Sequence, residues 1–270
     1  MTDVEGRLGL AGCRHCDDTD PQWYVAALAA ANFETGGNGV TPPHRVTRPR
    51  PAPSPAPKPV ANHKKHIADL ARRLVEAAGP VPARVREGWR CGLIRSAQPS
   101  ALAWLDAAAL QRLKANVPEG SAGALVAPLG AGVACQLLYL DHAHKKFGSP
   151  DKRTYGPAAG RGFGVGAGDT LRVCEGVADA LALSTQGGTV AAAVGSGGMG
   201  RLALAALHAG PARWRRITLV PDGDDQAAIQ KARATLAKLH AMSLTLGATC
   251  EFAIDAGWAP DPAAVWEGLR

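Results

Sequence analysis

Residues 170–194 read TLRVCEGVADALALSTQGGTVAAAV, and this stretch decides the fold class. Its two ends, residues 170–174 and 189–194, are short apolar runs that we interpret as strands. Residues 177–185, between them, are interpreted as a helix. A strand, a helix and a second strand in this order predict a unit in which the two strands run parallel.

The same alternation continues toward the C-terminus. Residues 199–208 and 225–240 predict helices, and residues 216–220 and 249–254 predict strands. Strands that alternate with helices predict a parallel sheet with helices on its faces. We therefore expect an α/β fold whose C-terminal part is a Rossmann-like parallel sheet flanked by helices.

The residues before this unit predict a smaller α+β part, made of two helices, a β-hairpin and a loop. The first helix has apolar residues at helical spacing and ends at Gly79-Pro80. The hairpin consists of two apolar runs joined through glycines 130–132, and the loop is rich in glycine and basic residues. These elements span residues 66–78, 98–116, 124–128 with 133–141, and 145–168, in that order.

A proline-rich segment lies near the N-terminus. Residues 41–60 read TPPHRVTRPRPAPSPAPKPV, with eight prolines in twenty positions, and proline is excluded from helix interiors and central strands. The net charge of +7 is concentrated here, because residues 41–73 carry eight basic residues and one acidic residue. Residues 1–40 carry six acidic and two basic residues. The basic stretch is either a solvated linker or an arm that lies on nucleic-acid phosphates.

Acidic residues follow three of the predicted strands. Glu175 comes directly after the first strand, Asp222 and Asp224 follow the third, and Asp261 follows the fourth. Ligands collect at the carboxyl ends of the strands in such a sheet. Carboxylates gathered there repel one another unless a cation lies between them, and hard oxygen ligands suit Mg²⁺ or Mn²⁺. The pattern predicts metal-assisted phosphoryl chemistry, and ordinary turn and helix-cap chemistry is the alternative.

The order of these motifs resembles the Toprim domain of bacterial-type DNA primases, topoisomerases and some nucleases. The motifs are E-G-x-x-D at 175–179, a glycine-rich loop at 195–199 and D-x-D at 222–224, and the resemblance covers about residues 169–262. It implies general acid–base work for one glutamate and Mg²⁺ binding by the D-x-D carboxylates. The implied catalytic residues are Glu175, Asp222 and Asp224.

The resemblance also implies roles for residues around these motifs. Asp179 matches an extra acidic position of primases, and Asp261 resembles the first acid of a later D-P-D motif in which Ala263 replaces the second aspartate. The implied metal-binding set is Glu175, Asp179, Asp222, Asp224 and Asp261, and Gly195 and Ser196 are implied nucleotide contacts. The alternative for the loop, a dinucleotide-binding G-x-G-x-x-G, is disfavoured because the loop follows the second strand of the unit.

Residues upstream of the sheet are similar to the segment that precedes Toprim in primase-like proteins of phages and other mobile elements. There a lysine-containing loop lies near template or nucleotide, and Lys152 and Arg153 are the matched positions. Lys145, Lys146 and Arg161 are further candidates, and a solvated loop is the alternative. Cationic side chains are needed in such a site, because triphosphates carry charge that the metal alone does not offset.

The N-terminal segment holds one C-x-x-C pair, Cys13 and Cys16. A tetrahedral zinc site needs four ligands, and only His15 and the distant His44 could add to this pair. We therefore favour ordinary thiols over a zinc site. Since primases of this kind usually begin with a zinc-binding module, the segment is interpreted as a remnant of one.

Four segments are predicted on this basis: residues 1–40, a small N-terminal segment; 41–64, a Pro-rich basic linker; 65–168, a basic subdomain; and 169–270, a Toprim catalytic domain. No apolar run reaches the roughly 18 residues of a membrane span, and no secretory signal is visible, so a cytoplasmic protein is expected. The sequence lacks the phosphate-binding G-x-x-x-x-G-K-[ST] of helicase ATPases, so a helicase would be a separate partner.

The expected function is that of a primase-like nucleotidyltransferase, which makes short primers from nucleoside triphosphates on single-stranded DNA with Mg²⁺ or Mn²⁺. Two alternatives stay open: a Toprim-type Mg²⁺-dependent nuclease, and a non-catalytic adaptor that binds nucleic acid during replication. A topoisomerase is disfavoured, because the chain has only three tyrosines for a transesterifying role.

Overall fold

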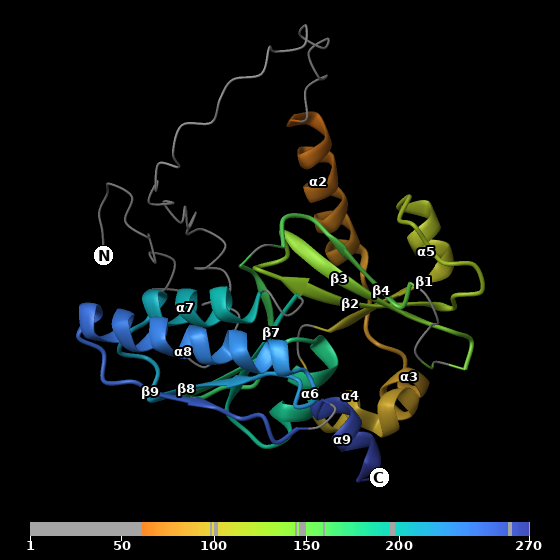
Figure 1. Ribbon diagram of the computed structural model, residues 1–270. Coiled ribbons are helices and arrows are strands. Elements are labelled where there is room, and N and C mark those ends of the chain that lie inside the picture. The colour runs from red at the N-terminus through yellow and green to blue at the C-terminus, as the bar shows by residue number, and fades with distance from the viewer. Residues whose placement is uncertain are drawn as a thin grey trace, which may run out of the picture.

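The computed structural model describes residues 61–269, except residues 98, 100–101, 144, 146–149, 159, 195–197 and 259–260. It contains two sheets with helices packed on them (Figure 1). The first sheet has the strand order β1-β2-β3-β4 and the second the order β5-β7-β6-β8-β9. The expected mixed α/β class is confirmed. Residues 1–60, with Cys13, Cys16 and most of the predicted linker, lie outside the described part.

The first sheet is antiparallel throughout. Its middle strands form the predicted hairpin, and the predicted first helix packs on one of its faces together with a short second helix. The strands are β1 (Ala103–Asp106), β2 (Gly123–Leu129), β3 (Ala134–Leu140) and β4 (Lys152–Tyr155), and the helices are α2 (Ala61–Ala77) and α5 (Ala107–Arg112).

The prediction of one helix over residues 98–116 is wrong. Residues 103–106 form strand β1, in which Trp104 pairs with Leu125 and Leu105 with Ala124. The helix begins only afterwards, because the Asp106 carboxylate accepts a hydrogen bond from the Ala109 amide at 2.7 Å and caps it. Edge pairing with β2 therefore overrides the alanine-rich helical composition of this segment.

The prediction of a loop over residues 145–168 is also wrong, because the segment contains two strands. β4 (Lys152–Tyr155) closes the first sheet, and β5 (Gly162–Val165) pairs antiparallel with β7 in the second sheet. Glycine content concealed β5: a Cβ at Gly162 would lie 2.7 Å from the Ala192 carbonyl oxygen. The glycine is thus a requirement of close packing there and not a sign of a loop.

The second sheet contains all four strands predicted after residue 169. β6 pairs in parallel with β7 and β8, and β8 with β9, but the edge strand β5 makes the sheet mixed. α6 covers one face, and α7 and α8 cover the other (Figure 1). The elements are β6 (Thr170–Cys174), α6 (Val177–Ser184), β7 (Thr189–Ala193), α7 (Met199–Ala209), β8 (Arg216–Val220), α8 (Gln226–Leu246) and β9 (Glu251–Ile254).

One apolar core joins the two sheets. It contains Leu125 of β2, Phe163 of β5 and Leu181 of α6, each with no exposed surface. Short helices close its lower side in Figure 1, and they are α3 (Ala83–Gly88), the 3-10 helix η2 (Trp89–Gly92), α4 (Leu93–Ala97) and α9 (Pro262–Gly268). The predicted boundary at residue 168 lies between β5 and β6, two strands of the same sheet. None of the helices that the structure describes is long and apolar enough to cross a membrane.

Candidate functional site

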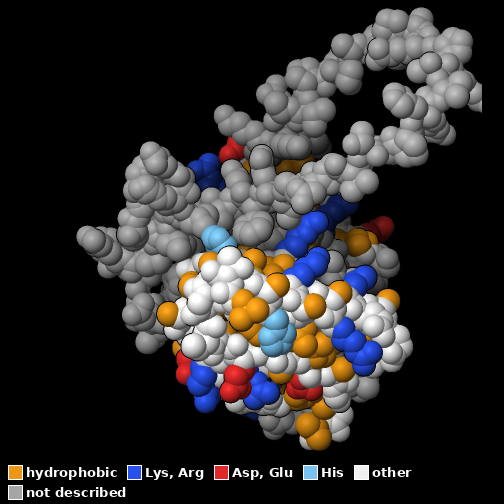
Figure 2. Space-filling model, turned by 60° about the vertical axis from the view of Figure 1, so that its left-hand side comes forward, with side chains coloured by type: hydrophobic (Ala, Val, Ile, Leu, Met, Phe, Trp, Pro, Cys, Tyr) orange, Lys and Arg blue, Asp and Glu red, His pale blue; other side chains and the backbone are white. Residues whose placement is uncertain are grey.

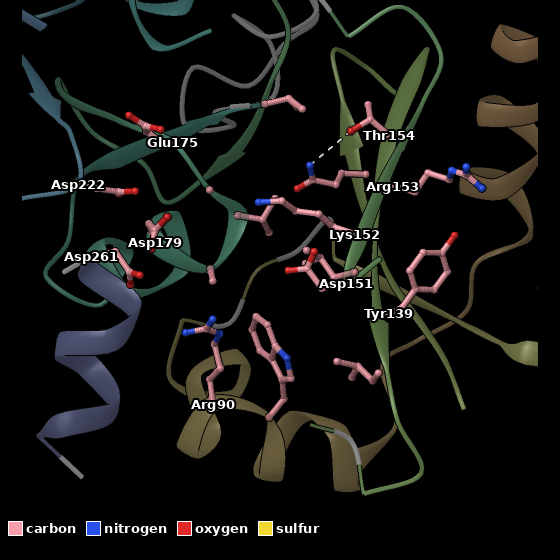
Figure 3. Close-up of a pocket in the computed structure, with 18 residues that line it drawn as sticks. Arg90, Tyr139, Asp151, Lys152, Arg153, Thr154, Glu175, Asp179, Asp222 and Asp261 are labelled. Atoms are coloured by element: carbon pink, nitrogen blue, oxygen red, sulfur yellow. Dashed lines mark hydrogen bonds between the residues drawn. The ribbon is translucent and has the colours of Figure 1, made fainter. Parts of the chain in front are cut away.

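A pocket of about 380 Å³ lies between the two sheets and is lined by charged residues from both (Figure 3). Four carboxylates line it on the side of the second sheet, and Lys152 of β4 reaches toward them from the other side. The charged or polar lining residues are Arg90, Gln136, Asp151, Lys152, Arg153, Thr154, Glu175, Asp179, Asp222 and Asp261.

The E-G-x-x-D motif builds one wall of this pocket. Glu175 follows the last residue of β6, and Asp179 lies in the first turn of α6, where a carboxylate interacts favourably with the helix dipole. Gly176 between them is packed closely against Asp179, because a Cβ there would lie 2.5 Å from the Asp179 carboxylate and would displace it. The spacing of the motif thus places both carboxylates in the pocket.

Glu175 has an unusual electrostatic environment. Burial is the largest cause that raises the pKa of its carboxyl to about 7, followed by the negative charges of Asp222 and Asp225, while Lys231 and Lys152 lower it. Its Oε1 atom is buried and has no hydrogen-bond partner. A buried carboxylate oxygen without a partner is rare in folded proteins and marks a place where a proton or a cation can bind.

Asp179 and Asp261 tie helix α9 to the pocket. Burial, and then the charges of Asp261 and Asp222, raise the pKa of Asp179 to about 7. Its carboxylate accepts a hydrogen bond from the Ala263 amide at 3.3 Å. Asp261 caps α9 by accepting a hydrogen bond from the Ala264 amide at 2.7 Å. Both carboxylates therefore have structural roles as well as positions in the pocket.

The D-x-D motif divides between the pocket and the surface. Asp222 lines the pocket, and burial together with the charges of Asp261 and Asp224 raises the pKa of its carboxyl. Asp224 is exposed and does not line the pocket. Gly223 separates them in a tight turn, in which its amide donates a 3.0 Å hydrogen bond to the Trp258 carbonyl oxygen. Asp225, the next residue, caps α8 by accepting hydrogen bonds from two amides of its first turn.

The structure separates the predicted basic residues. Lys152 points toward the carboxylates, whereas the Arg153 side chain points to the opposite side of β4 (Figure 3), as expected for neighbouring residues of a strand. Lys145 is exposed, and its amide donates a hydrogen bond to Asp141 at 2.9 Å. Arg161 contacts Gly130 at the hairpin turn. Neither Lys145 nor Arg161 lines the pocket. The predicted contacts Lys146, Gly195 and Ser196 lie outside the described residues.

Arg90 lines the pocket but was not among the residues predicted from the sequence. Its guanidinium donates to the Glu267 carboxylate at 2.7 Å, and its carbonyl oxygen accepts from the Trp266 indole at 3.0 Å. Its φ of 43° is in the left-handed region, which a non-glycine residue adopts only at a cost. No motif surrounds Arg90, so only the fold, which brings η2 beside α9, could reveal it.

The donor set of the pocket suits a hard divalent cation. Within the described part of the chain, no three His, Cys, Asp or Glu side chains form a group arranged to hold a metal ion. The chemistry of the donors nevertheless fits Mg²⁺ or Mn²⁺, since four of the five carboxylates that line the pocket lie together on the side of the second sheet and Glu175 Oε1 has no partner. The raised pKa values of Glu175, Asp179 and Asp222 share the same two causes, which are burial first and the negative charge of neighbouring carboxylates second.

Comparison with known proteins gives no match: no family model, no curated protein and no solved structure is similar to this chain.

Proposed function

We propose that this chain is a Toprim-type, primase-like nucleotidyltransferase that extends short primers on single-stranded DNA. One observation carries the proposal: a single pocket combines the carboxylates of Glu175, Asp179 and Asp222 with the ammonium group of Lys152. Metal-assisted phosphoryl transfer requires both, because carboxylates bind the cation and a basic side chain binds phosphate oxygens.

Glu175 is the proposed general base. With a pKa of about 7, its carboxylate accepts a proton from the attacking 3′ hydroxyl at Oε1, the buried oxygen without a hydrogen-bond partner. The hydroxyl oxygen then forms a bond to the α-phosphorus of the incoming nucleotide. The bond between the α-phosphorus and the bridging oxygen breaks, and pyrophosphate leaves with the electron pair.

Asp222 is the residue proposed to hold Mg²⁺ or Mn²⁺, with Asp179 and Asp261 beside it. When bound, the ion offsets the negative charge of the phosphates. Lys152 projects from the first sheet into the same space and binds triphosphate oxygens as a point charge. Arg90, held by Glu267, adds a second cation at the lower end of the pocket.

The test is primer synthesis from labelled nucleoside triphosphates on single-stranded DNA, with Mg²⁺ or Mn²⁺. Wild type is expected to make short products, and Glu175→Gln is expected to lose them. Glu251→Gln is the matched control, because Glu251 is exposed at the start of β9, at the other end of the sheet. Absence of product with wild type, or undiminished product with Glu175→Gln, would refute the proposal.

Two further incubations distinguish the other activities. Cleavage of nucleic acid with Mg²⁺ but without nucleotides would identify a nuclease, in which Glu175 activates water. Binding of nucleic acid without synthesis or cleavage would identify an adaptor. The position of Lys152 favours the transferase, because a triphosphate needs a cationic partner opposite the metal-binding carboxylates.

A further inference from the structure

A second groove lies on the outer face of α7 and α8, outside the pocket described above. Its volume is about 280 Å³, and three of its eight lining residues are cationic. Arg201, Lys231 and Lys238 are exposed, and none of them forms an ion pair with a carboxylate of the described residues. The complete lining is Met199, Gly200, Arg201, Leu204, Lys231, Ala234, Thr235 and Lys238.

Both helices lack acidic residues. α7 reads MGRLALAALHA and α8 reads QAAIQKARATLAKLHAMSLTL, so their 32 residues contain four Lys or Arg, two His and no Asp or Glu. Figure 2 brings forward the side of the molecule on which α7 and α8 lie in Figure 1; most acidic side chains there lie along the lower edge. An exposed face with a charge excess of one sign attracts a ligand of the opposite charge.

The cations are spaced along the groove. Lys231 and Lys238 are seven residues apart, about 10 Å along the helix axis, which equals the rise of about three stacked nucleotides. Thr235 lies between them on the same side, and Gly200 lets α7 approach closely, because a Cβ there would lie 2.5 Å from the Thr235 hydroxyl. Arg201 lies in the first turn of α7, where the helix dipole adds positive potential.

The lining contains no aromatic residue, so bases have no surface on which to stack. A ligand of this groove is therefore recognised by its charge and not by its sequence. Lys231 lines the groove and carries a positive charge that also acts on Glu175 in the pocket.

We propose that the α7–α8 groove binds the phosphates of single-stranded nucleic acid and guides the strand on which the pocket acts. The nature of the ligand rests on the proposed function, since a primer-synthesising pocket handles single strands. Binding itself requires neither catalysis nor a metal ion, so it can be tested separately. An acidic polypeptide is the competing ligand, and the test includes it.

The experiment measures the affinity of the full chain for fluorescein-labelled dT30 by anisotropy, in EDTA, at several salt concentrations. The test variant is Arg201→Gln/Lys238→Gln, which spares Lys231 because of its influence on Glu175. The control is Arg84→Gln/Arg86→Gln on α3, where both arginines are exposed and lie away from α7 and α8 (Figure 1). Glutamine preserves helix propensity, so both variants should fold, which thermal unfolding verifies.

The test variant is expected to bind dT30 about tenfold or more weakly. Its log–log salt dependence should be shallower by about 1.4, since each phosphate contact on a single strand contributes about 0.7. The control should match wild type. Equal affinity and slope in the test variant, or an equal loss in the control, would overturn the proposal. A loss of polyglutamate binding without loss of dT30 binding would also overturn it and assign the groove to an acidic protein.

These outcomes are independent of primer synthesis. If wild type makes no primers but the test variant loses dT30 binding, the proposed function fails and the groove remains a nucleic-acid site. If wild type makes primers and the variant binds dT30 normally, the groove proposal fails and the pocket assignment stands.

Discussion

At the scale of single residues, the ionised form of Glu175 opposes folding. Its pKa is about 7 in the folded chain and about 4.5 for an ordinary glutamate, so the folded state binds the proton more tightly than the unfolded state does. The stability that this group contributes is present below about pH 4.5 and is lost as the pH rises through 7. Asp179, with a raised pKa of about 7, acts in the same direction.

We therefore predict that Glu175→Gln stabilises the chain at pH 8 while it abolishes primer synthesis. The expected gain is about 1 kcal/mol after allowance for solvent screening of this half-buried group, or about 2–4 °C in Tm. At pH 5 the two proteins should be nearly equally stable. Urea unfolding in metal-free buffer at both pH values measures this, with Glu251→Gln as the control. A variant that shows the same pH dependence as wild type would contradict the account.

Divalent cations should reverse this pH dependence. Protons and Mn²⁺ compete for the same carboxylates, so Mn²⁺ is expected to raise Tm at pH 8 but not at pH 5. At saturating Mn²⁺ the shift at pH 8 should be several degrees, and it should largely disappear in Asp222→Asn. Asp224→Asn is the matched comparison: Asp224 is exposed outside the pocket, so it should retain most of the shift. Equal losses in both variants would indicate that the D-x-D motif binds the ion as a unit.

At the scale of elements, strand β4 separates two residues that the sequence could not tell apart. Lys152 and Arg153 are adjacent, and only Lys152 points into the pocket. We predict that Lys152→Gln lowers kcat/KM for nucleoside triphosphates about tenfold or more, which corresponds to about 1.4 kcal/mol or more. Arg153→Gln should remain within a few-fold of wild type. Steady-state primer synthesis decides this, and the reverse order of effects would show that the opposite face of β4 contacts the substrate.

Helix α9 supports Arg90 from the end of the chain. The Trp266 indole donates to the Arg90 carbonyl oxygen at 3.0 Å, and Glu267 holds its guanidinium. Trp266→Phe keeps an aromatic ring but removes this hydrogen bond, so we predict a loss of about 0.5–1.5 kcal/mol in stability. We also expect a higher KM for nucleotides with a smaller change in kcat, because Arg90 is freed to move. A lower kcat at unchanged KM would exclude a nucleotide-positioning role.

The sequence predicted elements well where they alternate regularly. After residue 169, every predicted strand and helix is present. The helix α8 extends beyond its predicted end to Leu246, where Gly247 caps it at a φ of 63°, the last strand begins at Glu251 and not at residue 249, and α9 was not predicted. Prediction failed where long-range pairing decides the structure. Trp104 is in a strand because β2 lies beside it, and β5 is a strand because β7 does. Local composition contains neither fact.

The candidate site shows the same limit. Glu175, Asp179, Asp222 and Asp261 could be predicted to share a sheet edge, because parallel strands end together there, and all four line one pocket. The exposure of Asp224 follows from the tight turn at Gly223, which the motif does not reveal. The sequence did not predict that the first sheet would supply Lys152 opposite these carboxylates, because that arrangement depends on packing between segments distant in the chain.

At the scale of the whole molecule, a shared apolar core joins the two sheets, so we predict that they unfold as one unit. Residues from β2, β5 and α6 form a single apolar cluster, and the pocket lies between the sheets that this cluster joins. The geometry of the pocket therefore depends on how the sheets pack. A substitution in the shared core at a residue of the first sheet should therefore alter the position of Glu175, although the two residues are far apart in sequence.

Leu125→Ala tests this coupling. Leu125 has no exposed surface and lies in the shared core, so its truncation should destabilise the chain by about 2–5 kcal/mol. We predict a single cooperative transition in urea, with tryptophan fluorescence and far-ultraviolet circular dichroism giving the same lowered midpoint.

Leu137→Ala is the matched control: Leu137 is equally buried but lies in the other core of the first sheet, with α2. Leu137→Ala should cost similar stability and disturb primer synthesis less, because its core is built from the first sheet with its own helices and connections and contains no residue of the second sheet. Two separate transitions, with only one shifted by Leu125→Ala, would show that the sheets unfold independently and that the pocket joins two autonomous domains.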